Sequence, residues 1–222
     1  MNRPPAGNGS QAQHARWLQD RNGGHLSAPL HLYLIRHGET AWSITGQHTG
    51  STDIALTPRG QDEARALGPF LRAKHFTQVL SSPSLRARQT CDLAGLGVAA
   101  EREPDLAEWD YGDYEGRCTV DIEQERPSWS VWRDGCPHGE TPANISHRAD
   151  RLLGRLRALS GNVALFSHGQ FGAALAARWI GLTVIQAQHF ALGPASISIL
   201  SYEPAHPHVP VIALWNADRI PR

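Results

Sequence analysis

Residues able to bind and transfer a phosphoryl group stand at three places along the chain. The segment RHG occupies residues 36–38, SSPSLRARQT occupies residues 81–90, and SHG occupies residues 167–169. Histidine can act as a nucleophile and carries protons near neutral pH. Arginine pairs with phosphate oxygens through a planar fork of N–H groups. Two histidines and two arginines brought together would therefore suit phosphoryl transfer.

The glycines and helix starts in these segments favour the same ligand. Glycine lets backbone N–H groups approach a ligand closely, and the N-terminus of a helix attracts an anion. Each charge-assisted hydrogen bond to a phosphate would contribute on the order of 1.5–3 kcal/mol. Any one segment alone is ordinary, because SSP is a common helix start and a lone histidine is more often structural. The prediction depends on their occurrence together.

Short apolar stretches precede all three segments and are predicted to be buried strands. These stretches are Leu30–Ile35, Val79–Leu80 and Val163–Phe166. In an open α/β sheet, ligands bind in the crevice beyond the carboxyl ends of the strands. The three polar segments are therefore expected to converge on one site.

Helical patterns alternate with these strands. Thr57 is a predicted N-cap followed by proline at the first helical position. Strands alternating with helices predict an α/β fold, here a single three-layer domain with a mainly parallel central sheet and helices on both faces. The segment from Trp109 to Pro142 is expected to be an excursion of this domain. The remaining predicted elements are helices from Ser82-Pro83, over Thr141–Leu159 and over Gly172–Ile180, and strands Ser196–Ser201 and Val211–Trp215 joined by the turn EPAHPHVP.

Composition limits the function classes. The 222 residues, with 41% hydrophobic and 19% charged content, suit one large domain. Lys+Arg and Asp+Glu both number 21, and this balance argues against nucleic-acid and membrane-surface binding. The three cysteines form no C-x-x-C motif, which argues against a disulfide framework or a zinc site. Reduced thiols in the cytosol are expected.

The N-terminal residues 1–28 are rich in Pro, Gly, Asn and Gln and are predicted to be a disordered tail, with a short helix around His14–Gln19. They lack the apolar core of a signal peptide or a membrane span. The predicted domain therefore covers residues 29–222, and a cytoplasmic location is expected. A homo-oligomer is left open.

The motifs LIRHGETAW, TDIALTPRGQDEA, SSPSLRARQT, EWDYGDYEG, GET and FSHG stand in this order along the chain. In sequence and in order these motifs resemble those of the histidine phosphatase superfamily, which has the phosphoglycerate mutase-like fold. The resemblance covers about residues 30 to 202. Within the superfamily, the motif sequences are most similar to those of the sedoheptulose 1,7-bisphosphatase branch.

This resemblance implies a catalytic role for five residues. His37 would be the nucleophile that forms a phosphohistidine, which water then hydrolyses. Arg36, Arg86 and His168 would bind the phosphoryl oxygens. Glu108 would protonate the leaving oxygen and then activate the water.

Further residues are expected around the substrate, whereas Glu115 is expected to be structural. No metal and no cofactor are expected, because arginines and histidines supply the positive charge. The chain departs from many relatives at Gln170 and Ala173, which affects the part of the site that selects the sugar. The expected substrate-binding residues are Ser43, Thr49, Gly50, Gly169, Glu140 and Thr141.

The implied function is a phosphomonoesterase that acts on a small phosphorylated metabolite, a sugar phosphate or bisphosphate. The far phosphate of a bisphosphate is expected to reach Arg117, Arg126 or Arg133. One alternative is a bisphosphoglycerate-dependent phosphoglycerate mutase. Such mutases carry a basic residue directly after the catalytic glutamate, where this chain has Trp109-Asp110. A second alternative is a non-enzymatic phospholigand-binding domain.

Overall fold

A six-stranded sheet forms the centre of the computed structural model, which describes residues 28–218. The strand order is β3-β2-β4-β1-β5-β6. The first four strands in this order pair in parallel. β5 pairs antiparallel with β1, and β6 pairs antiparallel with β5. The mainly parallel sheet predicted from the sequence is therefore confirmed. The strands are β1 (His31–Arg36), β2 (Phe76–Ser81), β3 (Ala100–Arg102), β4 (Asn162–Ser167), β5 (Ile197–Glu203) and β6 (His206–Ala217).

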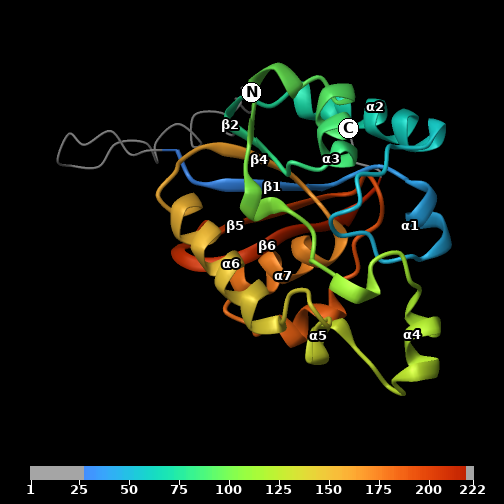
Figure 1. Cartoon of the computed structure of the whole chain (residues 1–222). Helices are drawn as coiled ribbons and strands as arrows, with labels where there is room; N and C mark the ends of the chain where they lie inside the picture. Colours follow the sequence, from blue (N-terminus) through green and yellow to red (C-terminus); the bar gives the residue numbers. More distant parts are fainter. Residues whose placement is uncertain (1–27, 219–222) are drawn as a thin grey trace, which may run out of the picture.

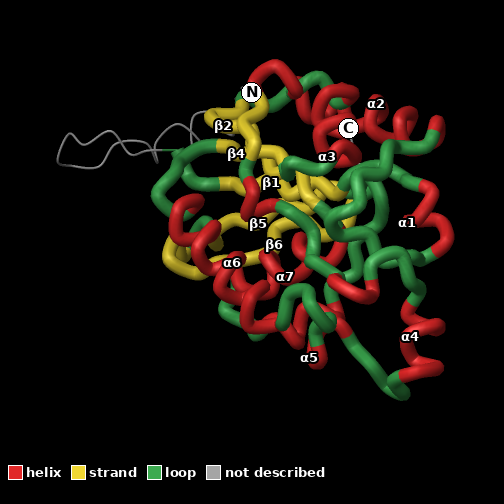
Figure 2. The backbone as a smooth tube through the Cα atoms, in the orientation of Figure 1, coloured by secondary structure: helices red, strands yellow, loops and turns green. Residues whose placement is uncertain are grey.

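Helices cover both faces of the sheet, and Figure 2 shows the strands as a yellow layer between red helices. The helices α2 (Pro58–Arg72) and α3 (Leu85–Leu93) lie on one face (Figure 1). The helices α6 (Pro142–Leu156) and α7 (Gly169–Trp179) lie on the other. The predicted three-layer α/β fold is confirmed.

β1 supplies both hydrophobic cores. Its residues Tyr33 and Ile35 pack in the core formed with α2 and α3, and Leu32 and Leu34 pack in the core formed with α6 and α7. Successive side chains of a strand point to opposite faces of a sheet. A strand buried on both faces must therefore be apolar throughout, which is why this stretch was recognisable in the sequence.

Helix starts agree with the sequence where a capping residue marks them. The Thr57 side chain accepts a hydrogen bond from Gly60 N, and Pro58 is the first residue of α2, as predicted. The start of α7 was predicted too late, at Gly172. The helix begins at Gly169, directly after the extended residue His168. The first turn, Gly169-Gln170-Phe171-Gly172, contains two glycines, which are poor helix formers, and His168 makes no side-chain cap that would mark the start.

The proline-rich segment 203–210 was predicted to be a turn, and this was wrong. Only residues 204–205 turn, and β6 already begins at His206. β6 is the last strand in the sheet order, and proline is tolerated on an edge strand because its missing N–H is not needed for pairing there. Pro210, for example, lies opposite Tyr202 of β5.

Residues 109–142 form an excursion that belongs to the same domain, as expected. Its side chains Trp109, Tyr111, Ile122 and Trp129 are buried in the core shared with α6 and α7. The short helix α1 was not predicted, because five residues are too few to show a period. The remaining helices are α1 (Ala41–Thr45), η2 (Gly97–Ala99), η3 (Pro104–Leu106), η4 (Gly112–Tyr114), α4 (Thr119–Glu125), α5 (Val131–Asp134) and η5 (Val184–His189).

The predicted tail, residues 1–28, and its expected helix around His14–Gln19 lie outside the described residues, apart from Ala28. Within residues 28–218, no helix combines the length and the apolar character needed to cross a bilayer. All three cysteines are free, as expected; Cys91 and Cys136 are buried, and Cys118 is partly exposed.

Candidate active site

The carboxyl ends of β1, β2 and β4 bring the three predicted segments together. Arg36 lies opposite Ser167 at the ends of β1 and β4. Hydrogen bonds continue one step past the strands, because His37 N–H donates to Ser167 O at 3.1 Å and Ser82 N–H donates to Phe166 O at 2.9 Å. The sheet itself therefore fixes the backbone on which the two histidine-glycine steps stand.

His37 is held with one ring nitrogen free to attack. The side chain is 5% exposed, and its Nδ1 lies 2.8 Å from the carbonyl oxygen of Gly38. A carbonyl can only accept a hydrogen bond, so Nδ1 carries the proton and Nε2 keeps its lone pair. A Cβ on Gly38 would lie 2.4 Å from the carbonyl oxygen of Gly60. Only glycine therefore allows α2 to approach the backbone of the candidate nucleophile this closely.

Both buried histidines are uncharged at neutral pH. Burial, assisted by the positive charges of Arg36 and Arg86, lowers the pKa of His37 well below 6.5. Burial and the Arg86 charge likewise lower the pKa of His168 well below 6.5. A lowered histidine pKa means that the neutral form persists into acidic solution. The lone pair of His37 is thus available across the neutral pH range.

Arg86 and His168 are fixed by a shared network. The fully buried Arg86 donates Nε–H to His168 Nδ1 at 3.2 Å. The neutral ring of His168 therefore carries its proton on Nε2, which lies 2.7 Å from Ser82 Oγ. The Nη groups of Arg86 donate to three carbonyl oxygens of residues 49–52 at 2.9–3.1 Å. These contacts use four of its five N–H groups and leave one for a ligand.

Arg36 offers a further donor beside the two imidazoles. Its Nη1 donates to the carbonyl oxygen of Leu192, and its Nε is buried without a hydrogen-bond partner in the protein. The rings of His37 and His168 stand 5.3 Å apart between centroids. An oxyanion at this position would meet N–H donors from several directions.

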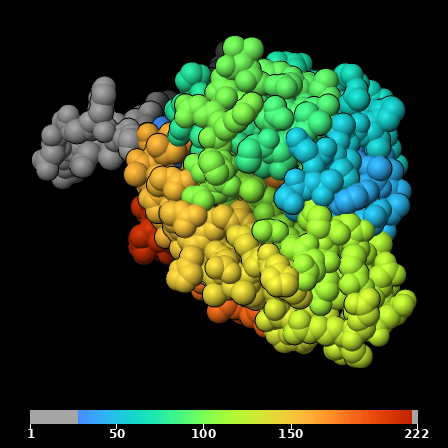
Figure 3. Space-filling view, viewed as in Figure 1, coloured from blue at the N-terminus to red at the C-terminus, as the bar shows by residue number. Residues whose placement is uncertain are grey.

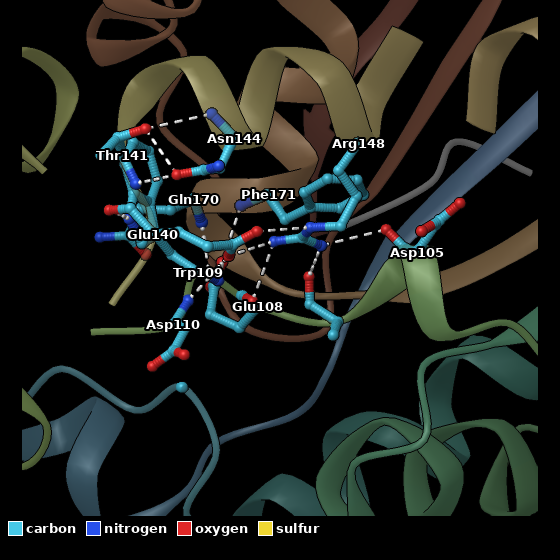
Figure 4. Close-up of polar contacts among 12 residues, drawn as sticks. Asp105, Glu108, Trp109, Asp110, Glu140, Thr141, Asn144, Arg148, Gln170 and Phe171 are labelled. Atoms are coloured by element: carbon cyan, nitrogen blue, oxygen red, sulfur yellow. Dashed lines mark hydrogen bonds and ion pairs between the residues drawn. The ribbon is translucent and has the colours of Figure 1, made fainter. Parts of the chain in front are cut away.

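Glu108 lies at the start of α7, where its carboxylate accepts three backbone hydrogen bonds (Figure 4). Phe171 N–H donates to Oε1 at 2.7 Å, Gln170 N–H donates to Oε2 at 3.1 Å, and Trp109 N–H donates to Oε1 at 2.9 Å. The N-terminus of a helix stabilises a negative side chain. α7 thus follows His168 directly and holds the carboxylate of Glu108 with its first turn.

Two cavities meet at Glu108. The smaller, of about 220 Å³, is lined by Arg36, His37, Glu108 and the expected substrate-binding residues Ser43 and Thr49. The larger of the two has a volume of about 530 Å³. It is lined by Gly50, Ser51, Asp53, Pro83, Ser84, Ala107, Glu108, Asp110, Glu140 and Arg148. Figure 3 shows a hollow where these blue, green and yellow segments meet. A still larger cavity of about 1030 Å³, between α2 and the end of β6, contains none of the predicted site residues.

The expected substrate-binding residues differ in whether they line a cavity at Glu108. Gly50 lines the larger cavity at Glu108, but its N–H donates to the carboxylate of Glu115 at 2.9 Å and its carbonyl binds Arg86. Glu115 is thus structural, as expected. Glu140 lines the same cavity, whereas Thr141 lies outside both cavities and caps α6. Ser43 Oγ accepts from Thr40 N–H at 2.9 Å and so completes the cap of α1.

Sequence reasoning missed several residues that support the site. Ser82 accepts from His168, and Thr90 Oγ1 accepts from Gly38 N–H at 3.0 Å. Neither contact has a local signal, because each joins residues far apart in the chain. Arg148 does have one, since it lies on the same helical face as Ile145 and Leu152, which are fully buried. A charge on an apolar helix face predicts a buried ion pair.

The three arginines expected to reach a far phosphate are paired with carboxylates. Arg117 forms two hydrogen bonds to Glu125 at 2.7 and 3.0 Å. Arg133 lies 2.7 Å from Asp134, and Arg126 lies 3.8 Å from the same carboxylate. None of the three lines either cavity at Glu108.

Histidine, cysteine and carboxylate side chains form no group that could hold a metal ion, as far as residues 28–218 are concerned. The expectation of metal-independent chemistry stays a prediction.

His48 provides a test of how burial affects stability. Its side chain is 8% exposed, and its ring stacks on that of Tyr111 with 4.6 Å between the ring centroids. Burial lowers the pKa of His48 to about 4. Below pH 6.5 the unfolded chain binds a proton at this histidine, whereas the folded chain does not until about pH 4. Folding stability therefore falls as the pH drops through this window. His48→Phe keeps the stacked ring and removes the titration.

We expect the unfolding free energy of the wild type to fall by about 1.5 kcal/mol more than that of His48→Phe between pH 6.5 and pH 5. Urea denaturation of both proteins at the two pH values measures the difference. Parallel pH dependences would contradict the assignment.

The chain matches the family model of the histidine phosphatase superfamily (branch 1) over residues 32–217. An acid phosphatase of Mycobacterium tuberculosis is 43% identical over 176 residues, which are 78% of this chain and 86% of that protein. A sedoheptulose 1,7-bisphosphatase of Saccharomyces cerevisiae is 38% identical over 184 residues, 68% of each chain.

Solved structures show the same fold. The structure of an open reading frame from Mycobacterium tuberculosis has a TM-score of 0.79 and 39% identity, and the match covers 84% of this chain and 96% of that chain. A mycobacterial glucosyl-3-phosphoglycerate phosphatase in complex with VO3 has a TM-score of 0.74 and 27% identity, with coverages of 84% and 98%.

Proposed function

Because the chain belongs to the histidine phosphatase superfamily and is a phosphoric monoester hydrolase, we propose that His37 and Glu108 carry its reaction. The observation that supports this most directly is the hydrogen bond from His37 Nδ1–H to the carbonyl of Gly38. It leaves Nε2 unprotonated in a cavity that Glu108 also lines. A nucleophile and a proton carrier in one cavity are the two groups that ester hydrolysis requires.

In the first step, His37 Nε2 attacks phosphorus while the bond from phosphorus to the ester oxygen breaks. Protonated Glu108 gives its proton to the leaving oxygen, so an alcohol departs and a phosphohistidine remains. Arg36 and Arg86 stabilise the charge on the phosphoryl oxygens as this happens. His168, expected from the sequence to bind these oxygens, supports them through Arg86, because its N–H is directed to Ser82 and its Nδ1 accepts from Arg86. The buried, unpartnered Nε of Arg36 supports this part of the proposal.

In the second step, water attacks the phosphohistidine and passes a proton to the Glu108 carboxylate. The bond between phosphorus and nitrogen breaks, and inorganic phosphate leaves. Neutral His37 and protonated Glu108 are restored, so the two steps balance. No metal and no cofactor enter this proposal.

We propose a sugar phosphate or a related phosphorylated metabolite as the substrate. Among the relatives are a sedoheptulose 1,7-bisphosphatase and a glucosyl-3-phosphoglycerate phosphatase, both named for sugar-containing phosphates. The smaller cavity is also lined by hydroxyl and amide side chains, which can exchange hydrogen bonds with the hydroxyl groups of a sugar. These side chains, which line the smaller cavity, are Ser43, Gln47, Thr49, Thr119 and Gln170.

The function is tested by phosphate release from a panel of sugar phosphates, sugar bisphosphates, phosphoglycerates and nucleotides. We expect rapid release from at least one sugar phosphate, with activity unchanged after exhaustive treatment with a chelator. Interconversion of 2- and 3-phosphoglycerate with little phosphate release would instead support the mutase. Binding of these esters without any turnover would support a phospholigand-binding domain.

The proposal extends to the setting of the enzyme. We infer that residues 29–222 act as one phosphatase domain in the cytoplasm, with a small metabolite and no nucleic acid or membrane as its partner. The equal numbers of acidic and basic residues support the absence of a nucleic-acid partner. A homo-oligomer is compatible with the proposal.

A further inference from the structure

The loop that carries Glu108 has little regular structure of its own. Glu108 follows the single turn η3, and the next helix is η4 at Gly112–Tyr114. A general acid must be held within hydrogen-bond reach of the leaving oxygen, and a displacement of about 1 Å can cost a factor of 100 in rate. Something outside the loop must therefore hold it in place.

Arg148, in the middle of α6, contacts this loop at three carbonyl groups. Its Nη1 donates to Asp105 O at 3.1 Å and to Ala107 O at 2.6 Å. Its Nη2 donates to Glu108 O at 3.1 Å. The guanidinium also lies 4.2 Å from the centroid of the Phe171 ring. Arg148 thus touches the backbone of Glu108 and the residue whose N–H binds the Glu108 carboxylate (Figure 4).

Glu140 completes the arrangement from the other side of the loop. Its carboxylate pairs with Arg148 through Nε at 2.9 Å and Nη2 at 2.7 Å. The same carboxylate accepts from Asp110 N–H at 2.9 Å. The carbonyl of Glu140 accepts from Trp109 Nε1 at 2.9 Å. The pair therefore holds the chain both before and after Glu108.

The hydrogen bonds of Arg148 exclude a direct role in binding phosphate. A guanidinium has five N–H groups. Two of those of Arg148 go to Glu140, and three go to the carbonyls of the loop. None remains for a substrate, and the negative charge of Glu140 balances the positive charge. Arg148 can thus act on the reaction only through the groups that it holds.

We propose that Arg148, paired with Glu140, is the positioning residue of the general acid. It fixes the Glu108 carboxylate between the first turn of α7 and the leaving oxygen of the ester. This inference rests on the proposed acid role of Glu108. It also gives Glu140 a different part from the expected contact with substrate.

The test compares two substrates that need protonation to different degrees. The leaving group of p-nitrophenyl phosphate departs with little help, whereas the alcohol of glycerol phosphate needs a proton. Arg148→Lys keeps the charge but cannot hold three carbonyls and a carboxylate at once. We expect kcat to fall by about 10–100-fold with glycerol phosphate and by less than about 3-fold with p-nitrophenyl phosphate, as part of the factor of about 10²–10⁴ for general acid catalysis.

Arg151→Lys is the matched control. Arg151 stands three residues further along α6 and is bonded to the carboxylate of Asp105 at 2.6 and 3.0 Å, with its side chain 56% exposed. It holds none of the three carbonyls, and Arg155 also donates to the Asp105 carboxylate at 3.0 Å. Its substitution should therefore change neither rate by more than about 2-fold. The ratio of the two rates does not depend on the fraction of folded enzyme. It therefore separates positioning from loss of fold.

Glu140→Gln is a milder variant, because glutamine can still accept from Asp110 N–H. We expect the same direction of change in the ratio, with a smaller size. An unchanged ratio in both Arg148→Lys and Glu140→Gln, alongside a large change in Glu108→Gln, would overturn this inference alone. An unchanged ratio in Glu108→Gln would instead remove the acid role itself.

Discussion

Replacing His37 with alanine is expected to abolish phosphate release, with a loss of turnover of more than about 10⁴-fold. The physical reason is that, within residues 28–218, no other nucleophile takes the position of the His37 Nε2. The imidazole of His168, whose ring centroid lies 5.3 Å from that of His37, accepts from Arg86 at Nδ1 and has its Nε2 against Ser82, so neither of its nitrogens presents a lone pair to the substrate. Turnover of a sugar phosphate by purified wild type and variant measures the loss.

A second measurement on His37→Ala tests the intermediate directly. Brief incubation of the wild type with a ³²P-labelled ester, followed by quenching, should yield a phosphoenzyme that is stable in alkali and labile in acid. The variant should show none. His147→Ala, which removes an exposed histidine of α6, should retain both the label and the turnover. Near-normal turnover by His37→Ala would end the covalent mechanism.

Replacing Glu108 with glutamine is expected to lower turnover of an alkyl phosphate by about 10²–10⁴-fold, because the amide keeps the shape but cannot deliver a proton. The loss should be much smaller with p-nitrophenyl phosphate. Steady-state kinetics with the two esters measure both losses. The hydrogen bond from Phe171 N–H can be kept by the amide oxygen, so the variant should fold normally.

Asp113→Asn is the control for this substitution. Asp113 belongs to the same motif, but its carboxylate is 57% exposed and pairs with His138 at 2.9 Å. Both esters should be turned over at nearly the wild-type rate by this variant. Equal losses on the two esters in Glu108→Gln would show that Glu108 is not the proton donor.

The sequence was sufficient to predict the strands that carry His37 and His168. Each is an apolar run buried on both faces and followed at once by polar residues, so the carboxyl end of the strand is visible in the pattern. Helices with a side-chain cap were also visible, as at Thr57. Where the chain omits such a signal, as at the start of α7 after His168, the boundary was misplaced.

The surroundings of Glu108 could not be predicted in the same way. Its position beside Gln170 depends on a contact across 62 residues, and no local period encodes such a contact. The residue was found through the family resemblance instead. Thr141 shows the opposite case. Its GET motif predicted a contact with substrate, whereas the structure places Thr141 at the N-cap of α6, outside both cavities.

The unpartnered Nε of Arg36 has a consequence for the end of the catalytic cycle. A buried donor without an acceptor costs about 1–3 kcal/mol, and any tetrahedral oxyanion that reaches it removes this cost. The phosphate ester and free orthophosphate both present phosphoryl oxygens that can accept a hydrogen bond from this Nε–H. Binding of the product therefore removes the same free-energy cost as binding of the substrate. Inhibition by the product, inorganic phosphate, is therefore expected from this geometry.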